Sequence, residues 1–474
     1  MSSAPLYPSL YEINTRVWLN TLSRRAGKAM TLADIDDATL DRLAERGFDW
    51  VWLLSVWRTG AASRAVSRSR PEWRDAFRAV LPDLVDDDIS GSGFAISAYD
   101  VDPSLGGRAA LAEFRAGLAK RGIRLMLDFV ANHTALDHPW VQTHRDFYIE
   151  GDGGALAHGR DPNFPGWPDT LQLDYANPAL QAAMKAELLA IADQCDGVRC
   201  DMAMLLLPQV FQRTWGRTPA PFWPGAIEAV RLAHRDFTFL AEVYWDLEGE
   251  MLQQGFDYCY DKRLYDRLRG GDGSTIRDHL AAGLDYQNHL ARFLENHDEP
   301  RAATIFPLER HRAAAVVTYL SPGLRFFHQG QLEGFRSQLP THLCRAPTEQ
   351  QDEAVAAFYD RLLSVIGTDD AFRAGAWTPI APQPAWSDNP TWRNFIACTW
   401  AGSNGIRYVV AVNDADHQGQ CRLPLPFDDG RRRLVDVMGD EIYIRDGSEM
   451  ASPGLYLDLG AWRSNVFRLD RLGS

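Results

Sequence analysis

Residues 124–130 read RLMLDFV, and this stretch decides the fold class. Its apolar residues continue without strict alternation, which is typical of a parallel β-strand buried on both faces. The segment before it, RAALAEFRAGLAKRG (108–122), has the spacing of an amphipathic helix and ends at Gly122. Glycine is favoured just beyond a helix C-terminus. A helix followed by a buried strand is the repeating unit of an α/β protein.

The same unit recurs along most of the chain. Eight apolar stretches rich in Val, Leu, Phe and Tyr alternate with helical patterns, of which 178–194 and 309–320 are further examples. Eight alternations favour a closed parallel barrel over an open sheet, so we predict a (β/α)8 TIM barrel of class α/β. The expected strands are 11–19, 49–56, 124–130, 195–201, 237–243, 256–260, 291–296 and 324–330.

Two segments interrupt the alternation. Residues 134–175 are rich in glycine and proline, lack periodicity and exceed an ordinary loop, so we expect a short domain inserted after strand 3. Towards the C-terminus, short strands separated by turn residues predict an antiparallel β-sandwich. The expected domains are the barrel (1–133 and 176–374), the inserted domain (134–175) and the C-terminal β-sandwich (375–474).

The composition of the 474-residue chain argues against several classes of protein. Its net charge of −14 disfavours a nucleic-acid partner and an anionic membrane surface. Neither a secretory leader nor an apolar run of transmembrane length is evident, so we expect no membrane association and a cytoplasmic location. The six cysteines form no CxxC pair, which favours buried free thiols over a zinc site.

Charged and polar residues gather at the C-terminal ends of the expected strands. In a barrel of this type, catalysis takes place at those ends. Taken singly, each residue has a structural explanation, such as a buried ion pair, a helix cap or a loop aspartate. Their occurrence at four strand ends instead favours one shared site. They are Asp128, Asn132 and His133; Arg199 and Asp201; Glu242; and Glu295, Asn296, His297 and Asp298.

These residue types suit glycosidic bond cleavage with retention of configuration. That reaction needs an ionised carboxylate as nucleophile and a protonated carboxyl group as general acid. Arg199, two residues before Asp201, would share a face of the strand with it and keep it ionised. Glu242 lies near Tyr244 and Trp245, and a less polar pocket there would raise the pKa of its carboxyl group.

Three further residues would act on the bound sugar. The transition state carries positive charge, which a third carboxylate, that of Asp298, would stabilise. His133 and His297 would hydrogen-bond sugar hydroxyl groups. We therefore expect one mouth of the barrel to hold the whole site.

Four ordered motifs resemble those of the α-amylase family of retaining α-glycoside hydrolases (glycoside hydrolase family 13). They are DFVANH (128–133), GVRCDMA (197–203), AEVYWD (241–246) and ENHDEPR (295–301). The resemblance implies Asp201 as nucleophile, Glu242 as acid/base and Asp298 as stabiliser of the transition state. It makes residues 134–175 an unusually short domain B. It implies substrate binding by Arg199, His133, His297, Phe94, Asp128, Tyr244 and Trp245.

The chain departs from the family pattern at several positions. Phe94 stands where relatives often have a tyrosine that stacks on the sugar, and Gly91 stands where exo-acting relatives often have an aspartate. Many relatives bind calcium through an asparagine matching Asn132 and an aspartate, but here Gln172 occupies the aspartate position. Losing a carboxylate weakens a site for a hard cation, so we expect no calcium there, no other metal and no cofactor.

The function we expect is hydrolysis of α-glucosidic bonds in small glucosides or oligosaccharides through a covalent glycosyl-enzyme. A glucosyltransferase, transglycosylase or isomerase would use the same intermediate, and the sequence leaves these alternatives open. A non-catalytic carbohydrate-binding protein is the alternative of another class. It predicts loss of at least one of Asp201, Glu242 and Asp298, and all three are present.

The charged segment 63–90, after strand 2, has two interpretations. The favoured one is a solvated helical excursion. In the other, Trp57, Arg58 or Trp73 shapes a pocket for the group attached to the sugar, which would suit a small glucoside better than starch.

Overall fold

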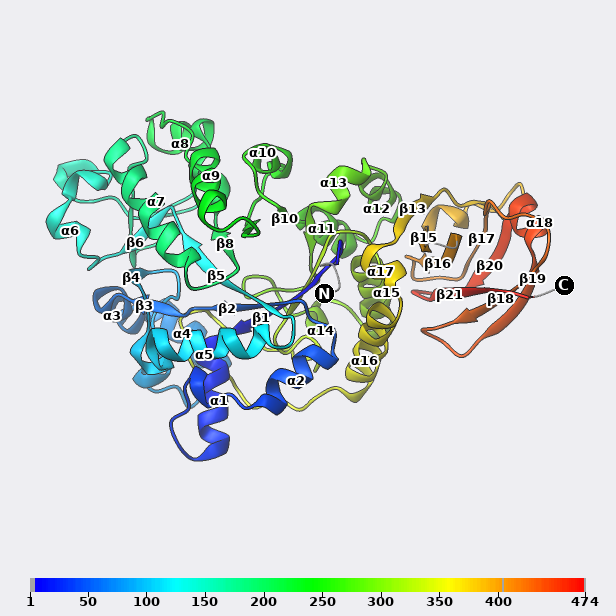
Figure 1. Ribbon diagram of the computed structural model, residues 1–474, viewed down its shortest axis with the longest axis horizontal. Coiled ribbons are helices and arrows are strands. Elements are labelled where there is room, and N and C mark those ends of the chain that lie inside the picture. Colours follow the sequence, from blue (N-terminus) through cyan, green and yellow to red (C-terminus); the bar gives the residue numbers. More distant parts are fainter. Residues whose placement is uncertain (1–4, 403–404, 473–474) are drawn as a thin grey trace.

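The computed structural model describes residues 5–402 and 405–472, and a closed barrel of eight parallel strands lies at its centre (Figure 1). Each barrel strand pairs with the barrel strands that come before and after it along the chain, and the last one, β12, pairs with β1 and closes the barrel. The predicted (β/α)8 barrel is therefore confirmed. Its strands are β1 (Ser9–Asn14), β2 (Trp50–Leu54), β5 (Arg124–Val130), β8 (Gly197–Asp201), β9 (Thr238–Ala241), β10 (Tyr258–Tyr260), β11 (Leu290–Arg292) and β12 (Leu324–His328).

Helices connect the barrel strands and surround them. The helices predicted at 108–122, 178–194 and 309–320 are present as α5, α7 and α15. The longer connecting helices are α1 (Thr15–Ala26), α2 (Asp37–Glu45), α5 (Gly107–Ala119), α7 (Pro178–Ala192), α8 (Pro208–Trp215), α9 (Trp223–Ala233), α11 (Lys262–Gly270), α12 (Gly273–Leu280), α15 (Leu308–Tyr319) and α16 (Glu353–Thr368).

The first strand ends earlier than its sequence predicts. A strand over 11–19 is wrong in its second half, because β1 stops at Asn14 and α1 begins at Thr15. The Asn14 side chain accepts a hydrogen bond from the backbone N–H of Val17 at 3.3 Å and so caps the helix. Asparagine is among the strongest N-cap residues, and this local bond outweighs the apolar pattern beyond it.

Two hairpins extend from the ends of the barrel strands. In one, β3 (Trp57–Thr59) pairs with β4 (Ile96–Val101), and α3 (Ala61–Ser69) and α4 (Pro71–Val80) lie between them, as the helical interpretation of this segment predicts. In the other, β6 (His133–Ala135) pairs with β7 (Thr170–Gln172). Trp57 is fully buried, and its Nε1 donates to the Asp128 carbonyl at 2.8 Å. Trp57 thus belongs to the core.

The C-terminal part consists of two antiparallel sheets that share one apolar core, as predicted. The sheets have the strand orders β13-β15-β16-β21-β18-β19 and β14-β17-β20, and their buried residues form one cluster that includes Phe395, Val409 and Leu457. The strands are β13 (Ala376–Ile380), β14 (Gln383–Pro384), β15 (Phe395–Gly402), β16 (Gly405–Asn413), β17 (Gly419–Leu423), β18 (Arg431–Asp436), β19 (Ile442–Asp446), β20 (Leu455–Leu459) and β21 (Ser464–Arg471).

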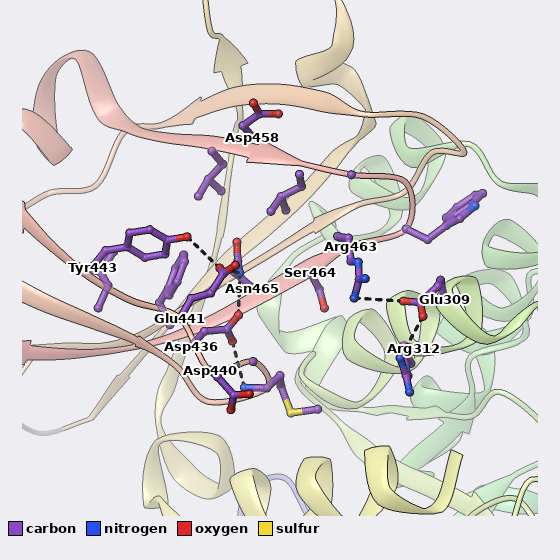
Figure 2. Close-up of a pocket in the computed structure, with 18 of the residues that line it drawn as sticks. Glu309, Arg312, Asp436, Asp440, Glu441, Tyr443, Asp458, Arg463, Ser464 and Asn465 are labelled. Carbon is purple, nitrogen blue, oxygen red and sulfur yellow. Dashed lines mark hydrogen bonds and ion pairs between the residues drawn. The ribbon is translucent and has the colours of Figure 1, made fainter. Parts of the chain in front are cut away.

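The sheets contact the barrel through the buried side chain of Trp400 and through ion pairs that cross a polar groove. Trp400 is fully buried, with its ring edge-on to Tyr7 at 5.1 Å and its Nε1 donating to the Leu320 carbonyl at 2.8 Å. A groove of about 820 Å³ separates α15 and α16 from the sheets (Figure 2). Charged side chains pair across it, as Arg463 does with Glu309 at 3.5 Å. These contacts join the C-terminal sheets to the barrel helices.

The structure bears on two expectations from the sequence, that the chain lacks a transmembrane helix and that its cysteines are buried free thiols. Across residues 5–402 and 405–472, no helix is both long and apolar enough to cross a bilayer. All six cysteines carry free thiols, and every one except the half-buried Cys344 is buried.

Replacing Gly323 tests the close packing where β12 enters the barrel. Gly323 has φ +104°, and a Cβ atom there would lie 2.2 Å from the carbonyl oxygen of Leu290. Gly323→Ala should therefore lower the free energy of unfolding by about 2 kcal/mol or more, measured by urea denaturation. Gly249→Ala is the matched control, because a Cβ atom there meets nothing within 4 Å. Equal stability of the two variants would contradict this packing.

Candidate active site

The barrel brings the predicted charged residues to one end. Asp128 lies in β5, Arg199 and Asp201 in β8, Glu242 one residue beyond β9, and Asp298 beyond β11. Each side chain therefore lies at or just past the C-terminal end of a parallel strand, where a barrel presents its loops.

A single buried guanidinium group joins three of the carboxylates. Arg199 is completely buried; its Nη1 donates to Asp201 Oδ1 at 2.7 Å, and its Nη2 lies 2.7 Å from Glu242 Oε2. Asp128 Oδ1 lies 3.7 Å from the same Nη1. Arg199 and Asp201 thus share one face of β8, as predicted, and are joined by a hydrogen bond. Arg199 also contacts the carboxylate of Glu242, which follows the next barrel strand, β9.

Aromatic rings surround this guanidinium group. Its central carbon lies 5.2 Å from the ring centre of Phe94, 5.3 Å from that of Trp52 and 5.8 Å from that of Tyr260. Ring faces attract a cation and keep water away from it. The charge of Arg199 therefore acts on its carboxylates in a medium of low dielectric constant, where such interactions are strong.

Strained backbone accompanies the carboxylates. Ser55, Met202, Trp245 and Asp246 all have positive φ, between 43° and 66°, and all follow barrel strands. The Met202 N–H donates to Glu242 Oε2 at 2.7 Å, and the Ser55 N–H donates to Asp128 Oδ2 at 3.3 Å. Residues with side chains rarely adopt this conformation, and it is found mainly where function requires it. At two of these positions it aims a backbone donor at a buried carboxylate.

The carboxylates differ in protonation. Burial raises the pKa of Glu242 to about 7, although Arg199 opposes the shift. Burial also raises the pKa of Asp201, against the charge and hydrogen bond of Arg199. Burial acts in the same direction on Asp298, but there the charge and hydrogen bond of His297 prevail and lower the pKa. Environments that separate the pKa values of neighbouring carboxyl groups are typical of acid/base catalysis.

The site opens on the side of Asp298. The side chain of Asp298 is 47% exposed, whereas those of Asp201 and Glu242 are 8% and 3% exposed. His297 Nε2 lies 3.0 Å from Asp298 Oδ2, and the His297 ring lies 5.4 Å from that of Phe94. A ligand reaching Asp201 would therefore pass Asp298 and the face of Phe94.

The remaining predicted residues occupy different parts of the site. The Tyr244 hydroxyl donates to Glu242 Oε1 at 2.8 Å. His133 is buried in β6, with its ring 5.1 Å from Trp167, and burial lowers its pKa to about 4, so it is neutral. Trp245 packs against the guanidinium group of Arg213 at 5.5 Å.

Comparison with known proteins identifies relatives of this chain. The family model for the α-amylase catalytic domain matches residues 37–254. The chain is 25% identical to alpha-amylase MalA of Haloarcula japonica over 62% of this chain and 44% of that protein. It is 29% identical to trehalose-6-phosphate hydrolase of Escherichia coli, over 51% of this chain and 55% of the relative. Residues 37–254 therefore belong to the α-amylase catalytic-domain family.

The fold of a solved alpha-amylase extends over nearly the whole chain. The crystal structure of maltogenic alpha-amylase AmyB from Thermotoga neapolitana superimposes with a TM-score of 0.74 at 20% identity, covering 98% of this chain and 99% of that one. By contrast, the chain spans about half the length of the curated relatives named above, 44% and 55%.

The position at which many α-amylase family members bind calcium does not fit that ion here. Gln172 Nε2 donates to Asn132 Oδ1 at 3.0 Å, and Asn132 Nδ2 donates to Gln172 Oε1 at 3.2 Å. The side-chain oxygen of each amide thus accepts a hydrogen bond from the other amide. Among the described residues, no group of three or more histidine, cysteine, aspartate or glutamate side chains could hold a metal ion. Calcium needs six to eight oxygen ligands, with charge among them.

Sequence reasoning missed two residues next to the site, Glu12 and His328. Glu12 Oε1 lies 2.5 Å from His297 Nδ1, and Glu12 Oε2 lies 2.7 Å from His328 Nδ1. The available signal was a lone glutamate inside the apolar stretch 9–13 and a histidine ending the stretch 324–328. Both belong to barrel strands, but neither lies in the four motifs.

Thermal unfolding tests whether the Asn132–Gln172 amide pair, and not a bound calcium ion, stabilises this position. We expect the melting temperature to be the same in EDTA and in millimolar calcium chloride, because Asn132 and Gln172 satisfy each other. Stoichiometric calcium in the purified protein, lost together with stability in the Gln172→Ala variant, would contradict this assignment.

Proposed function

We propose that the protein is a retaining α-glycoside hydrolase that cleaves α-glucosidic bonds in small glucosides or oligosaccharides. The observation that carries the proposal is the guanidinium group of Arg199, which holds Asp201 and Glu242 on its two nitrogens. Residues 1–133 and 176–374 would form the catalytic domain, 134–175 domain B and 375–474 the C-terminal domain.

Asp201 is the nucleophile in this proposal, and Glu242 is the general acid. Asp201 attacks the anomeric carbon while Glu242 protonates the departing glycosidic oxygen, which leaves a covalent glycosyl-enzyme. Water then attacks the same carbon, Glu242 takes its proton, and Asp201 is released. Two carboxylates on one guanidinium group are close together, which favours the short separation of about 5 Å used by retaining enzymes.

The distribution of protons supports these roles. Neighbouring like charges resist joint ionisation, so one proton is shared unequally between the two carboxyl groups. Asp201 accepts a direct hydrogen bond from Arg199, which favours its charged form. Glu242, with a pKa of about 7, keeps the proton that the leaving group needs.

The other residues would act on the sugar in the transition state. Asp298 is ionised and next to the opening, where it can stabilise the positive charge of an oxocarbenium-like transition state. Phe94 presents a ring on which the sugar can stack, and His133 offers a ring nitrogen to a sugar hydroxyl group. Both ring nitrogens of His297 face carboxylates, so His297 would act on the sugar through Asp298. Asp128, Tyr244 and Trp245 complete the proposed binding site.

Transfer to a sugar acceptor is the second candidate function. The deep burial of Asp201 and Glu242 favours it, because entry from one side limits the access of water to the glycosyl-enzyme. Incubation with α-linked disaccharides, with and without an acceptor, followed by mass spectrometry of the products would separate hydrolysis, transfer and isomerisation. A carbohydrate-binding protein without activity would release or transfer no sugar.

Replacing the two carboxylates tests their roles. Asp201→Asn and Glu242→Gln should each lower kcat on an active disaccharide by about a thousandfold or more, because each removes one half of the double displacement. Glu228→Gln, an exposed carboxylate on α9, is the control and should keep wild-type kcat. Native-like kcat in Asp201→Asn would contradict the mechanism.

The dependence of kcat/KM on pH tests the general acid. Activity should fall as pH rises through about 7, because Glu242 then loses the proton that it donates. Tyr244→Phe removes a hydrogen bond to the Glu242 carboxylate, so its charged form is less stable and its pKa rises. The alkaline limb should move upward by about one pH unit. A downward shift would show that Tyr244 does not act in this way.

A further inference from the structure

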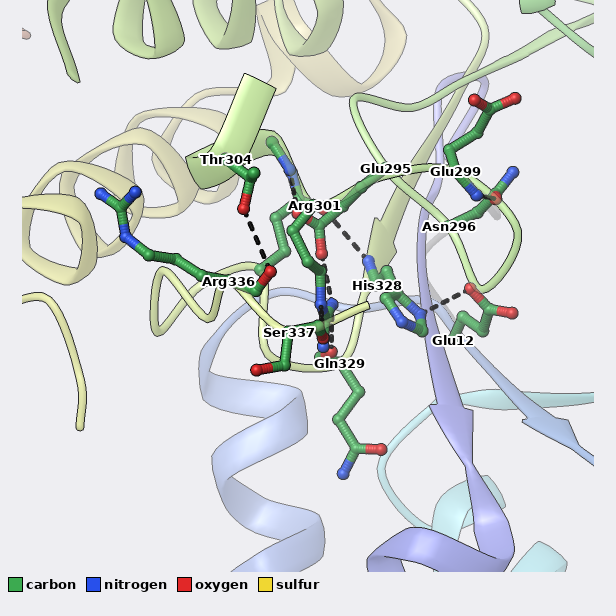
Figure 3. A network of polar contacts seen from close by, with 12 residues as sticks. Glu12, Glu295, Asn296, Glu299, Arg301, Thr304, His328, Gln329, Arg336 and Ser337 are labelled. Carbon is green, nitrogen blue, oxygen red and sulfur yellow. Dashed lines mark hydrogen bonds and ion pairs between the residues drawn. The ribbon is translucent and has the colours of Figure 1, made fainter. Parts of the chain in front are cut away.

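Glu12 is a fully buried carboxylate that contacts two histidines. It belongs to β1, and its oxygens lie 2.5 Å from Nδ1 of His297 and 2.7 Å from Nδ1 of His328. Figure 3 shows His328 reaching Glu12 from the neighbouring strand. Burying an unpaired carboxylate is strongly unfavourable, so these imidazole partners are what stabilises Glu12 in the barrel wall.

The register of the barrel fixes this arrangement. Glu12 is the direct partner of His328 on β12 and of Trp52 on β2. The edge-on contact of Trp52 with the His297 ring has a centre distance of 5.5 Å, and the Phe94 ring lies 5.4 Å from the same imidazole. The orientation of His297 is therefore set by two aromatic rings and by Glu12.

His297 has a carboxylate at each ring nitrogen. Nδ1 faces Glu12, and Nε2 lies 3.0 Å from Asp298 Oδ2. An imidazole donates from both nitrogens only when it is protonated. Burial alone would lower the pKa of His297, but the charges and hydrogen bonds of Asp298 and Glu12 raise it well above its usual value.

The groups around His297 and Glu12 carry an excess of negative charge. A cationic imidazolium among them reduces the repulsion between the carboxylates. The titratable and charged groups that face the pair are Asp298 beyond β11, Asp128 on β5, Asp201 and Arg199 on β8, Tyr260 on β10 and His328 on β12.

We propose that Glu12 is a positioning residue that holds His297 as an imidazolium donating from Nε2 to Asp298. His328 fixes the other oxygen of Glu12. Glu12 touches neither substrate nor reacting atoms in this scheme and acts through His297 on the charge of Asp298. The inference rests on the proposed function, because the charge of Asp298 matters through its part in the transition state.

Titration of His297 by NMR tests the proposal without any substrate. With ¹³C-labelled histidine, the His297 resonance is assigned by its loss in His297→Gln. In Glu12→Gln, which keeps the shape and removes the charge, His297 should titrate roughly 1–3 pH units lower than in the wild type. An unchanged titration in a folded Glu12→Gln protein would overturn the proposal.

Two further variants distinguish the effect of the Glu12–His297 contact from the effect of removing any buried charged side chain nearby. Glu295→Gln removes an equally buried carboxylate that pairs with Arg301 (Figure 3), and it should leave the titration of His297 unchanged. His328→Gln removes the other partner of Glu12, so the titration of His297 should not fall. A fall of about one pH unit or more in His328→Gln would overturn the assignment, so this variant tests it even if Glu12→Gln fails to fold.

Activity measurements distinguish this inference from the proposed function. In Glu12→Gln the alkaline limb of kcat/KM should move to lower pH, because His297 now loses its proton nearer the range in which Glu242 does. If the NMR shift occurs but the wild type cleaves and transfers no α-glucoside, the proposed function fails and the role of Glu12 stands. If the wild type is active and Glu12→Gln keeps its pH profile and titration, the role of Glu12 fails alone.

Discussion

The site depends on one buried cation, the guanidinium group of Arg199. Three carboxylates from three strands lie within 3.7 Å of its nitrogens, and three aromatic rings exclude water from it. Without this cation, the carboxylates would repel one another in a medium of low dielectric constant. The carboxylates are nevertheless unequal, because Asp201 accepts a hydrogen bond from Arg199, whereas burial raises the pKa of Glu242 to about 7.

Most of the barrel was predictable, because its strands are buried on both faces. Stretches such as 124–130 are therefore mostly apolar, without the alternation of a half-exposed strand, and β5 has those bounds. The end of β1 was not predictable from periodicity, since one hydrogen bond from Val17 to Asn14 decides it. A cap is a local contact, and it outweighs the apolar residues that continue into α1.

The candidate site was predictable only where its residues lie in motifs. Arg199 and Asp201 are two apart on one strand, so their contact follows from the alternation of side chains. The contact between Glu12 and His297 spans 285 residues and depends on how β1 aligns with its neighbours, which periodicity does not reveal. The positive φ values of Met202 and Trp245 could not be predicted from the sequence either, because neither residue type favours that conformation.

The pairing of β1 with β12 has a consequence for folding. Chains are synthesised from the N-terminus, so Glu12 is made early. Its partners His297 and His328 are made only after most of the barrel sequence has been synthesised. Contacts between distant residues are slow to form, and an open barrel exposes the edges of β1 and β12. The step that closes the barrel also brings Glu12 to His297. A chain whose barrel is still open would therefore lack the contact that sets the charge of His297, and the protonation of His297 would report on closure of the barrel.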